Sequence, residues 1–313
     1  MRTPTADPLL RYTDTSIARP LPPLLQAARG EVLAAARDLW TIPDAVLARP
    51  WSWIGGGEEE IRYGFYRLCE AFELAGHDAA VAIRSSGEDR GRAADLIAPA
   101  TAARWDLQGL LVPLPDATWS ADPGEGEWNI RRTIGHVIEA QRSYGLGTAW
   151  WQTQGYRADD PTLPATTPPE ALWEEIPTDE QEAEGSPTEI RDRLDGALDL
   201  ATERLSGLPA DRLGLGARWS GFTVDVGFRL GRWASHIREH TIQVEKTLVM
   251  LDHRPTEVDR LIRLVLAAWG RAEAVVYGSA DAPEAVEKLA AAAAGARVTA
   301  AEVADIARAD AAG

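Results

Sequence analysis

The chain has 313 residues, a formal net charge of −16, five histidines and one cysteine. This acidity argues against a nucleic-acid-binding protein and against binding to an anionic membrane surface, because both need clustered lysine and arginine. The single cysteine, Cys69, can form neither an intrachain disulfide nor a multi-thiolate metal site, and we expect it to be buried and inert. Any metal site must therefore use histidine and carboxylate ligands.

The sequence shows no recognisable targeting segment. Its N-terminal residues lack the apolar core of a signal peptide. No apolar run approaches the roughly 18 residues that a membrane-spanning helix needs. We therefore expect a cytoplasmic protein with the composition of an ordinary globular chain.

Helical periodicity begins after an arm at residues 1–20 that is rich in Pro and Thr. Apolar residues then recur three and four positions apart, which is the pattern of a helix with one buried face. We expect these helices at residues 24–40, 58–75, 93–112, 128–151, 186–208, 223–250 and from 256 onward. Alternating strand patterns are absent, so the predicted fold class is all-α.

Local signals mark where several helices start. Residues 154–186 contain five prolines and a run of acids, which predicts a long irregular connection. Ser186, with Glu189 three positions later, predicts a helix start with a capping box. Thr256 predicts another start, and Thr299 a further one within the Ala-rich tail.

A weak internal repeat links two of the predicted helices. The spacing from Ile61 to Glu70 equals that from Ile130 to Glu139, and a Trp-Ser dipeptide precedes each pair. This similarity predicts that residues 24–76 duplicate the helical hairpin that contains Ile130. The alternative is chance similarity between acid-rich helices.

Three histidines form a candidate metal site. His236 and His240 lie four residues apart in a predicted helix, so both imidazoles project from one face. With this spacing, one helix can supply two ligands to the same metal ion. Glu239 directly precedes His240 and points away from that face, which argues against a His-Glu-x-x-His protease. His136 lies mid-helix in 128–151, where a bundle would bring it against the pair. The alternative is that His136 is a hydrogen-bonded core residue and that the pair is solvated or structural.

The other two histidines have ordinary structural interpretations. His77 follows Gly76 at a predicted helix end, where it would interact with the last carbonyl groups. His253 lies in a turn before Pro255, and we expect it at the surface.

Two segments resemble the DinB-like metalloprotein superfamily. They are residues 127–144 (EWNIRRTIGHVIEAQRSY) and residues 232–243 (RWASHIREHTIQ), and the similarity covers about residues 90–252. The resemblance implies that His136, His236 and His240 bind a divalent ion, most often zinc or nickel. In the proposed repeat, Arg67 takes the place of His136, so the duplicated hairpin would have lost that ligand.

The resemblance also implies a fold. We expect an all-α protein with a DinB-like four-helix bundle and a long crossover, an extra N-terminal helical hairpin and C-terminal helices. The predicted division is an arm (1–20), the hairpin (21–89), the metal-binding bundle (90–280) and an Ala-rich helical tail (281–313).

The function that the resemblance implies is metal-dependent catalysis on a small-molecule substrate. It would be a transferase, isomerase or hydrolase that uses a low-molecular-weight thiol or a metal-bound water. Glu139, Tyr144 and Gln243 lie within a turn or two of the predicted ligands, which makes them candidates for orienting or acid–base roles. The alternative is a non-catalytic, metal-stapled bundle that binds a small molecule or a protein partner. We expect no nucleic-acid or membrane partner. Such bundles often form homodimers, and no sequence feature fixes the oligomeric state.

Overall fold

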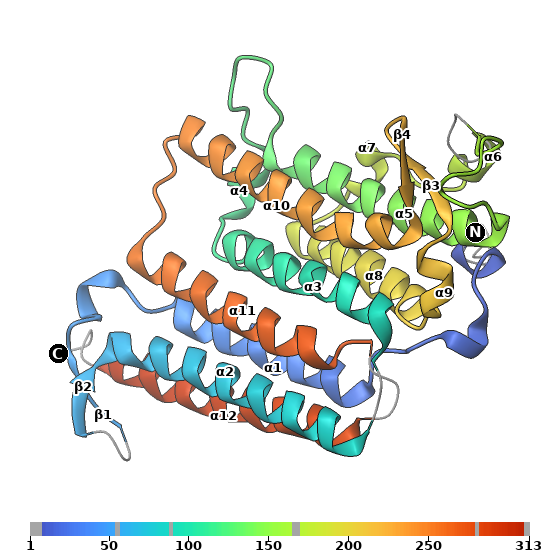
Figure 1. The fold of residues 1–313 in the computed structure, drawn as a ribbon. Coiled ribbons are helices and arrows are strands. Elements are labelled where there is room, and N and C mark those ends of the chain that lie inside the picture. The colour runs from blue at the N-terminus through green and yellow to red at the C-terminus, as the bar shows by residue number, and fades with distance from the viewer. Residues whose placement is uncertain (1–7, 54–56, 88–89, 165–169, 279–281, 310–313) are drawn as a thin grey trace, which may run out of the picture.

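The computed structural model describes residues 8–53, 57–87, 90–164, 170–278 and 282–309. Helices dominate these residues, which confirms the all-α prediction (Figure 1). The long helices are α1 (Pro23–Trp40), α2 (Ile61–Ser86), α3 (Gly91–Leu111), α5 (Ile130–Gln154), α8 (Pro187–Leu205), α10 (Val226–Met250), α11 (Glu257–Val276) and α12 (Pro283–Ala309). No helix among the described residues has both the length and the apolar character that crossing a membrane requires.

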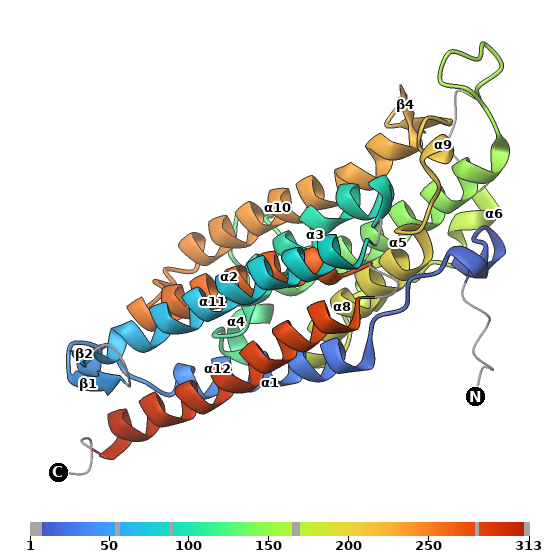
Figure 2. The same ribbon diagram turned by 60° about the horizontal axis from the view of Figure 1, so that its bottom comes forward.

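Short elements connect the long helices. The helical ones are η1 (Pro8–Arg11), η2 (Thr15–Ile17), η3 (Asp44–Val46), α4 (Asp116–Ser120), α6 (Glu170–Trp173), α7 (Asp179–Glu182) and α9 (Ala210–Leu213). Two antiparallel hairpins complete the structure: β1 (Pro50–Trp53) pairs with β2 (Gly57–Glu60), and β3 (Gly216–Trp219) with β4 (Phe222–Asp225). The two hairpins lie at opposite ends of the molecule (Figures 1 and 2).

The long helices form two four-helix bundles that lie side by side (Figure 1). One apolar core is built from α3, α5, α8 and α10. The other is built mainly from α1, α2, α11 and α12. Helix α3 packs directly against α11, and Trp105 of α3 belongs to the second core. The N-terminal hairpin (α1 and α2) and the two C-terminal helices (α11 and α12) are therefore the two halves of one bundle.

The two bundles share one packing pattern. In the first, α3 and α5 each pack against both α8 and α10. In the second, α1 and α2 each pack against both α11 and α12. This correspondence is what a duplicated hairpin would produce, although a common origin of the two hairpins stays a prediction. Arg67 in α2 pairs with Glu70 at 2.5 Å and lies over the Tyr63 ring, so its contacts are structural.

The predicted domain boundaries also stay a prediction. Residues 90–280 were expected to form one unit, but α11 shares its core with α1, α2 and α12 while also packing on α3. Residues 1–7 of the predicted arm lie outside the described residues. The rest of the arm packs against the bundle, since η1 contacts both α5 and α8, and Leu9 is buried.

Several predicted helix starts are confirmed and two boundaries are wrong. Ser186 and Thr256 each form a capping box at the start of α8 and α11. No helix starts at Thr299, because α12 runs unbroken through the Ala-rich tail and alanine has the highest helix propensity. No helix ends at Gly76 either. A Cβ atom there would lie 3.0 Å from the Ala272 Cα, so this glycine allows α2 and α11 to pack closely.

The helix predictions over residues 58–60 and 223–225 are also wrong, because these residues form strands β2 and β4. Each strand has only four residues, too few for an alternating pattern to stand out. The Ser220-Gly221 dipeptide is the sequence signal for the turn of the second hairpin. Ser220 and Gly221 both have positive φ angles of 45° and 85°, as the favoured two-residue hairpin turns require.

Candidate metal centre

The three predicted ligands meet between α5 and α10. His136 comes from α5, and His236 and His240 come from α10. One nitrogen from each imidazole lies within 4.8 Å of the other two. Within the described part of the chain, no other group of three His, Cys, Asp or Glu side chains comes together in this way.

Local sequence fixes the two helices that carry these histidines. The Asn129 side chain accepts a hydrogen bond from the Arg132 backbone N–H at 2.9 Å and caps α5. Asp225 caps α10 in the same way through the Phe228 N–H at 2.6 Å. Each histidine lies beside the apolar stripe of its helix, so the packing of the two stripes brings the imidazoles to the groove between them.

The pair on α10 is held in close contact. The Nε2 atoms of His236 and His240 lie 3.0 Å apart. His240 Nδ1 lies 2.8 Å from the side-chain oxygen of Gln243, and an amide oxygen can only accept, so we assign the His240 proton to Nδ1. The lone pair of His240 is then on Nε2, and it faces either a proton on His236 or a bound ion.

Burial keeps the imidazoles neutral. His236 is only 5% exposed, and burial, reinforced by His240 and His136, lowers its pKa to about 3. Burial also lowers the pKa of His136 and of His240. Neutral imidazole is the form that binds a metal, so protons compete little for these nitrogens at neutral pH.

These residues fit a divalent ion. Metal–nitrogen bonds of about 2.0–2.1 Å allow two ligands of one ion to lie up to about 4 Å apart. The His236–His240 separation of 3.0 Å meets this limit. The widest separation in the group, up to 4.8 Å, requires one ring to shift by less than about 1 Å. One feature is unusual: His236 Nδ1 is buried and has no hydrogen-bond partner among the described residues, whereas most metal-bound imidazoles donate through their second nitrogen.

Comparison with known proteins identifies the family. Residues 100–244 match the family model of the DinB superfamily. This part of the chain belongs to the DinB superfamily. The match starts within α3 and ends within α10, so it includes all three histidines. No curated protein and no solved structure shows a significant match to the chain.

DinB superfamily members bind divalent metals. The histidine cluster of this chain lies wholly within the matched region, whereas α1, α2, α11 and α12 lie outside it. The second bundle is therefore an addition to the DinB region, and among its described residues no histidine, cysteine or carboxylate cluster corresponds to the one in the first.

An arginine and a tryptophan lie at each end of the histidine cluster. At one end, Trp128 contacts His136 with ring centroids 5.4 Å apart, and Arg132 lies 4.6 Å above the Trp128 ring. At the other end, Arg229 and Arg232 lie 5.1 and 5.7 Å from the centre of the Trp219 ring. Trp128 and Trp219 each precede a predicted helix that carries histidines, which had made both candidates for an aromatic pocket wall. The position of Arg232 beside Trp219 could not be predicted, because no local pattern shows that hairpin β3–β4 packs against α5 and α10.

The three candidate orienting or acid–base residues have different surroundings. Gln243 bonds directly to His240. Tyr144 lies 5.0 Å from His236 between ring centroids, and burial raises the pKa of its hydroxyl to about 12. Glu139 accepts a hydrogen bond from the Ser143 hydroxyl at 2.6 Å, and burial raises its pKa. Among the described contacts, Glu139 has no hydrogen bond or ion pair with a histidine, so its proposed role has the least support.

Helix α7 from the long connection packs on α5 beside His136. A Cβ atom at Gly135 would lie only 2.3 Å from the Asp179 carbonyl oxygen, so the absent side chain allows this contact. The negative charge of Asp179 opposes the effect of burial on the pKa of His136. Arg142 secures the same segment through Glu182, which is 2% exposed, at 2.5 Å. The acidic connection is therefore closer to the site than its position in the sequence indicates.

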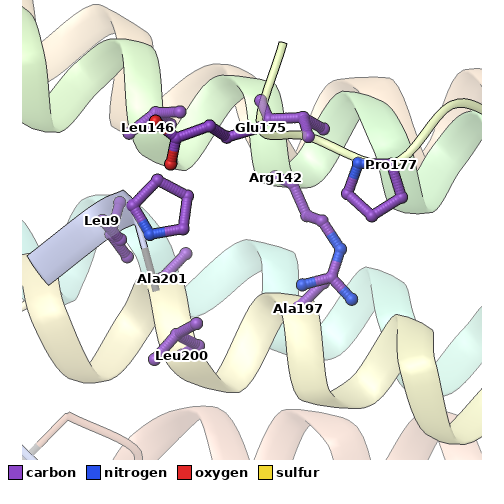
Figure 3. Close-up of a pocket in the computed structure, with 11 residues that line it drawn as sticks. Leu9, Arg142, Leu146, Glu175, Pro177, Ala197, Leu200 and Ala201 are labelled. Atoms are coloured by element: carbon purple, nitrogen blue, oxygen red, sulfur yellow. The ribbon is translucent and has the colours of Figure 1, made fainter. Parts of the chain in front are cut away.

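A separate cavity of about 250 Å³ lies between α5, α8 and η1 (Figure 3). Its walls are mainly apolar and include Leu9, Leu146, Leu200 and Ala201, with Arg142 and Glu175 as charged members. None of the three clustered histidines lines it. This cavity is therefore distinct from the histidine cluster.

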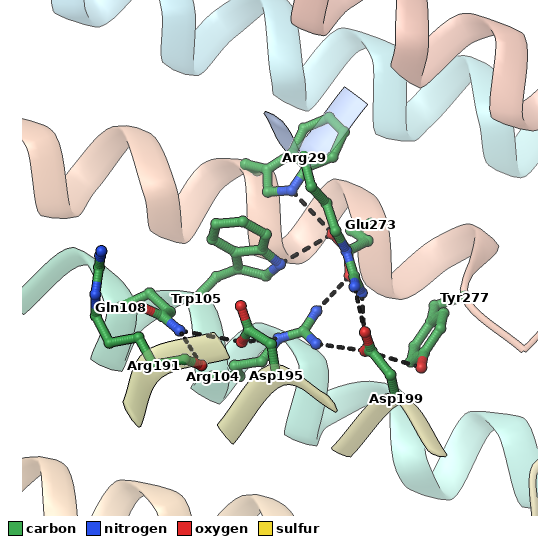
Figure 4. A network of polar contacts seen from close by, with 10 residues as sticks. Arg29, Arg104, Trp105, Gln108, Arg191, Asp195, Asp199, Glu273 and Tyr277 are labelled. Atoms are coloured by element: carbon green, nitrogen blue, oxygen red, sulfur yellow. Dashed lines mark hydrogen bonds and ion pairs between the residues drawn. The ribbon is translucent and has the colours of Figure 1, made fainter. Parts of the chain in front are cut away.

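A buried cluster of charges connects the two bundles (Figure 4). Glu273 of α11 is fully buried and accepts hydrogen bonds from Arg29, Arg104 and two tryptophan indoles. Asp199 of α8 accepts from both arginines and from the Tyr277 hydroxyl. Both carboxylates accept hydrogen bonds from several donors, so we interpret the cluster as a structural contact that holds the two bundles together.

The remaining predicted positions lie away from the histidine cluster. His77 is exposed in the middle of α2, so its predicted interaction with a helix end is wrong. His253 is partly buried in the turn after α10, where its backbone N–H donates to the Leu248 carbonyl at 2.9 Å. Cys69 is buried, as predicted, and burial raises the pKa of its thiol to about 12.

Proposed function

We propose that this protein binds one divalent metal ion through His136, His236 and His240. The supporting observation is the convergence of three imidazoles from two helices to within 4.8 Å, and burial lowers the pKa of each one. Imidazole is a good ligand for zinc and nickel, and the DinB region of the chain contains all three residues. Zinc or nickel is the metal that we propose.

We further propose that the centre acts on a small molecule. Three protein ligands leave a position free on a four-coordinate ion. When bound, such an ion lowers the pKa of a coordinated water or thiol towards neutrality. The aromatic rings of Trp128 and Tyr144 border the imidazoles and would orient the substrate. The reaction class is transfer, isomerisation or hydrolysis, with a low-molecular-weight thiol or water as the second reactant.

Elemental analysis of the purified full-length protein tests the metal site. We expect about one zinc or nickel ion per wild-type chain and loss of most of it in the double variant His236→Ala/His240→Ala. The matched control is His77→Ala/His253→Ala, which removes two histidines outside the cluster and should keep the metal. Equal metal content in the wild type and in the His236/His240 variant would refute the site.

A screen of the metal-loaded protein tests catalysis. Thiol-dependent transfer and isomerisation, and hydrolysis of simple esters and amides, would be measured for the wild type and the His236/His240 double variant. Turnover that needs the histidine pair supports the enzyme. If the protein binds one metal ion per chain but shows no turnover in any of these assays, the non-catalytic, metal-stapled bundle is favoured instead.

A further inference from the structure

Arg232 lies beside the proposed metal centre without belonging to it. It is one helical turn before His236 on α10, so the two side chains project from neighbouring positions on one face. Its guanidinium lies 5.7 Å from the Trp219 ring. Trp219 contacts Tyr144 at 4.5 Å, and Tyr144 contacts His236 at 5.0 Å, both between ring centroids. A continuous aromatic wall therefore runs from Arg232 to the imidazoles.

The hydrogen-bonding capacity of Arg232 is only partly used. One terminal nitrogen, Nη2, donates to Glu239 at 2.7 Å. The other, Nη1, is buried and has no hydrogen-bond partner among the described residues. Glu239 is 55% exposed, so solvent screens this ion pair and leaves much of the positive charge effective. The same charge acts on both His236 and His240, where it lowers the pKa of each imidazole.

A buried donor without a partner is unfavourable, and such groups in folded proteins usually have a specific reason. The guanidinium group presents its donors in a planar fork that matches the two oxygens of a carboxylate. An anion at Nη1 would satisfy this donor near the Trp219 ring, one helical turn from His236 on the same helix.

We propose that Arg232 recognises a carboxylate on the small molecule that binds the metal centre. The preferred ligand then carries both a metal-binding atom and a carboxylate. This inference rests on the proposed function, because the ligand must reach a metal held by the three histidines. The overall charge of −16 repels anions, so a preference for an anionic ligand must come from a local group such as Arg232.

The test uses the full-length protein loaded with cobalt(II), which reports thiol binding through a sulfur-to-cobalt absorption band. Three thiols of similar size differ in their second functional group and its charge: mercaptoacetate carries an anionic carboxylate, 2-mercaptoethanol a neutral hydroxyl and cysteamine a cationic ammonium group. We expect mercaptoacetate to bind most tightly and cysteamine most weakly. Mercaptoacetate can also chelate cobalt by itself, so the decisive comparison is between protein variants.

In Arg232→Met, the affinity for mercaptoacetate should fall about tenfold, a typical effect of losing one charge-assisted contact. The affinity for 2-mercaptoethanol should not change. Arg232→Lys keeps the charge but not the fork, so it should restore part of the affinity. The matched control is Arg132→Met, which removes the arginine over Trp128 at the other end of the cluster and should leave the binding of all three thiols unchanged. The ligand-field absorption bands of cobalt show, for each variant, whether the metal centre of that variant is intact.

The outcomes separate this inference from the proposed function. Mercaptoacetate binding that is the same in the wild type and Arg232→Met would overturn the carboxylate inference and leave the metal centre standing. An equal loss of mercaptoacetate affinity in the Arg132→Met control would also overturn the inference, because removing any nearby positive charge would then have the same effect. Failure of cobalt or of all three thiols to bind would overturn the proposed function, and this inference with it.

Discussion

The side-chain oxygen of Gln243 lies 2.8 Å from His240 Nδ1, and His240 Nε2 lies 3.0 Å from His236 Nε2. The two contacts are on opposite edges of one imidazole ring. Gln243 therefore orients the ring and directs its Nε2 lone pair into the histidine cluster. A contact of this kind affects metal affinity without touching the metal.

Replacing Gln243 with leucine should weaken metal binding by about 10–100-fold, because His240 would lose the acceptor that fixes its tautomer. Competition with a chromophoric chelator measures the dissociation constant. Gln243→Glu keeps an acceptor at the same distance and should retain most of the affinity. Wild-type affinity in Gln243→Leu would show that the contact does not position the ligand.

The stability of the metal-free protein should fall as the pH is lowered from about 6.5. Burial holds the pKa of His236 at about 3 in the folded chain, whereas an unfolded histidine titrates near about 6.5. Between these two pH values the unfolded chain binds more protons than the folded chain. The contribution of neutral, buried His236 to the free energy of unfolding is therefore complete above about pH 6.5 and is lost as the pH falls towards 3.

Urea unfolding of the metal-free protein at pH 7.5 and pH 5.0 tests this prediction. His236→Gln removes the titrating group, so the loss of unfolding free energy between the two pH values should be smaller by about 2 kcal/mol. His77→Gln changes an exposed histidine and should behave like the wild type. An unchanged pH dependence in His236→Gln would contradict the prediction.

Gly135→Ala should disturb the proposed metal site by displacing α7 from α5. The added Cβ would meet the Asp179 carbonyl oxygen at 2.3 Å, so α7 must move away from α5 next to His136. Overpacking of this kind costs about 1–3 kcal/mol. Thermal or urea unfolding gives the stability change, and chelator competition gives the metal affinity, which should also fall.

Gly196→Ala in α8 is the control for this effect. Nothing lies within 4 Å of a Cβ atom at that position, and alanine favours a helix by about 0.5–1 kcal/mol over glycine. Its stability should therefore rise while metal affinity stays the same. Equal behaviour of the two alanine variants would mean that the contact between α7 and α5 has no energetic importance.

Glu273→Gln should destabilise the protein strongly. Arg104 is fully buried and donates to Glu273 at 2.5 Å, and Arg29 donates to the same carboxylate at 2.6 Å. Removing the charge leaves two buried cations with too few acidic partners, which costs about 3–5 kcal/mol. Glu70→Gln breaks the exposed pair with Arg67 and should cost less than about 1 kcal/mol. Unfolding free energies from urea titration compare the two. A small effect for Glu273→Gln would mean that the cluster contributes little to joining the bundles.

The starts of helices could be predicted from the sequence, because they depend on residues that are close together in the chain. The capping boxes at Ser186 and Thr256 depend on residues three positions apart. Gly76 shows the limit of this reasoning. Its residue type suits a helix end, and only the close approach of Ala272 explains why the helix continues through it.

The four-residue spacing of His236 and His240, and the helical periodicity around them, were determined by the sequence alone, because a helix places residues i and i+4 on one face. The arrival of His136 from α5, the contact of α7 with Gly135, and the position of Trp219 and Arg232 beside the cluster were decided only by the tertiary structure. These relationships join elements that are far apart in the chain. They arise when the apolar stripes of α5 and α10 pack together, and no local pattern specifies which residues then meet across the groove.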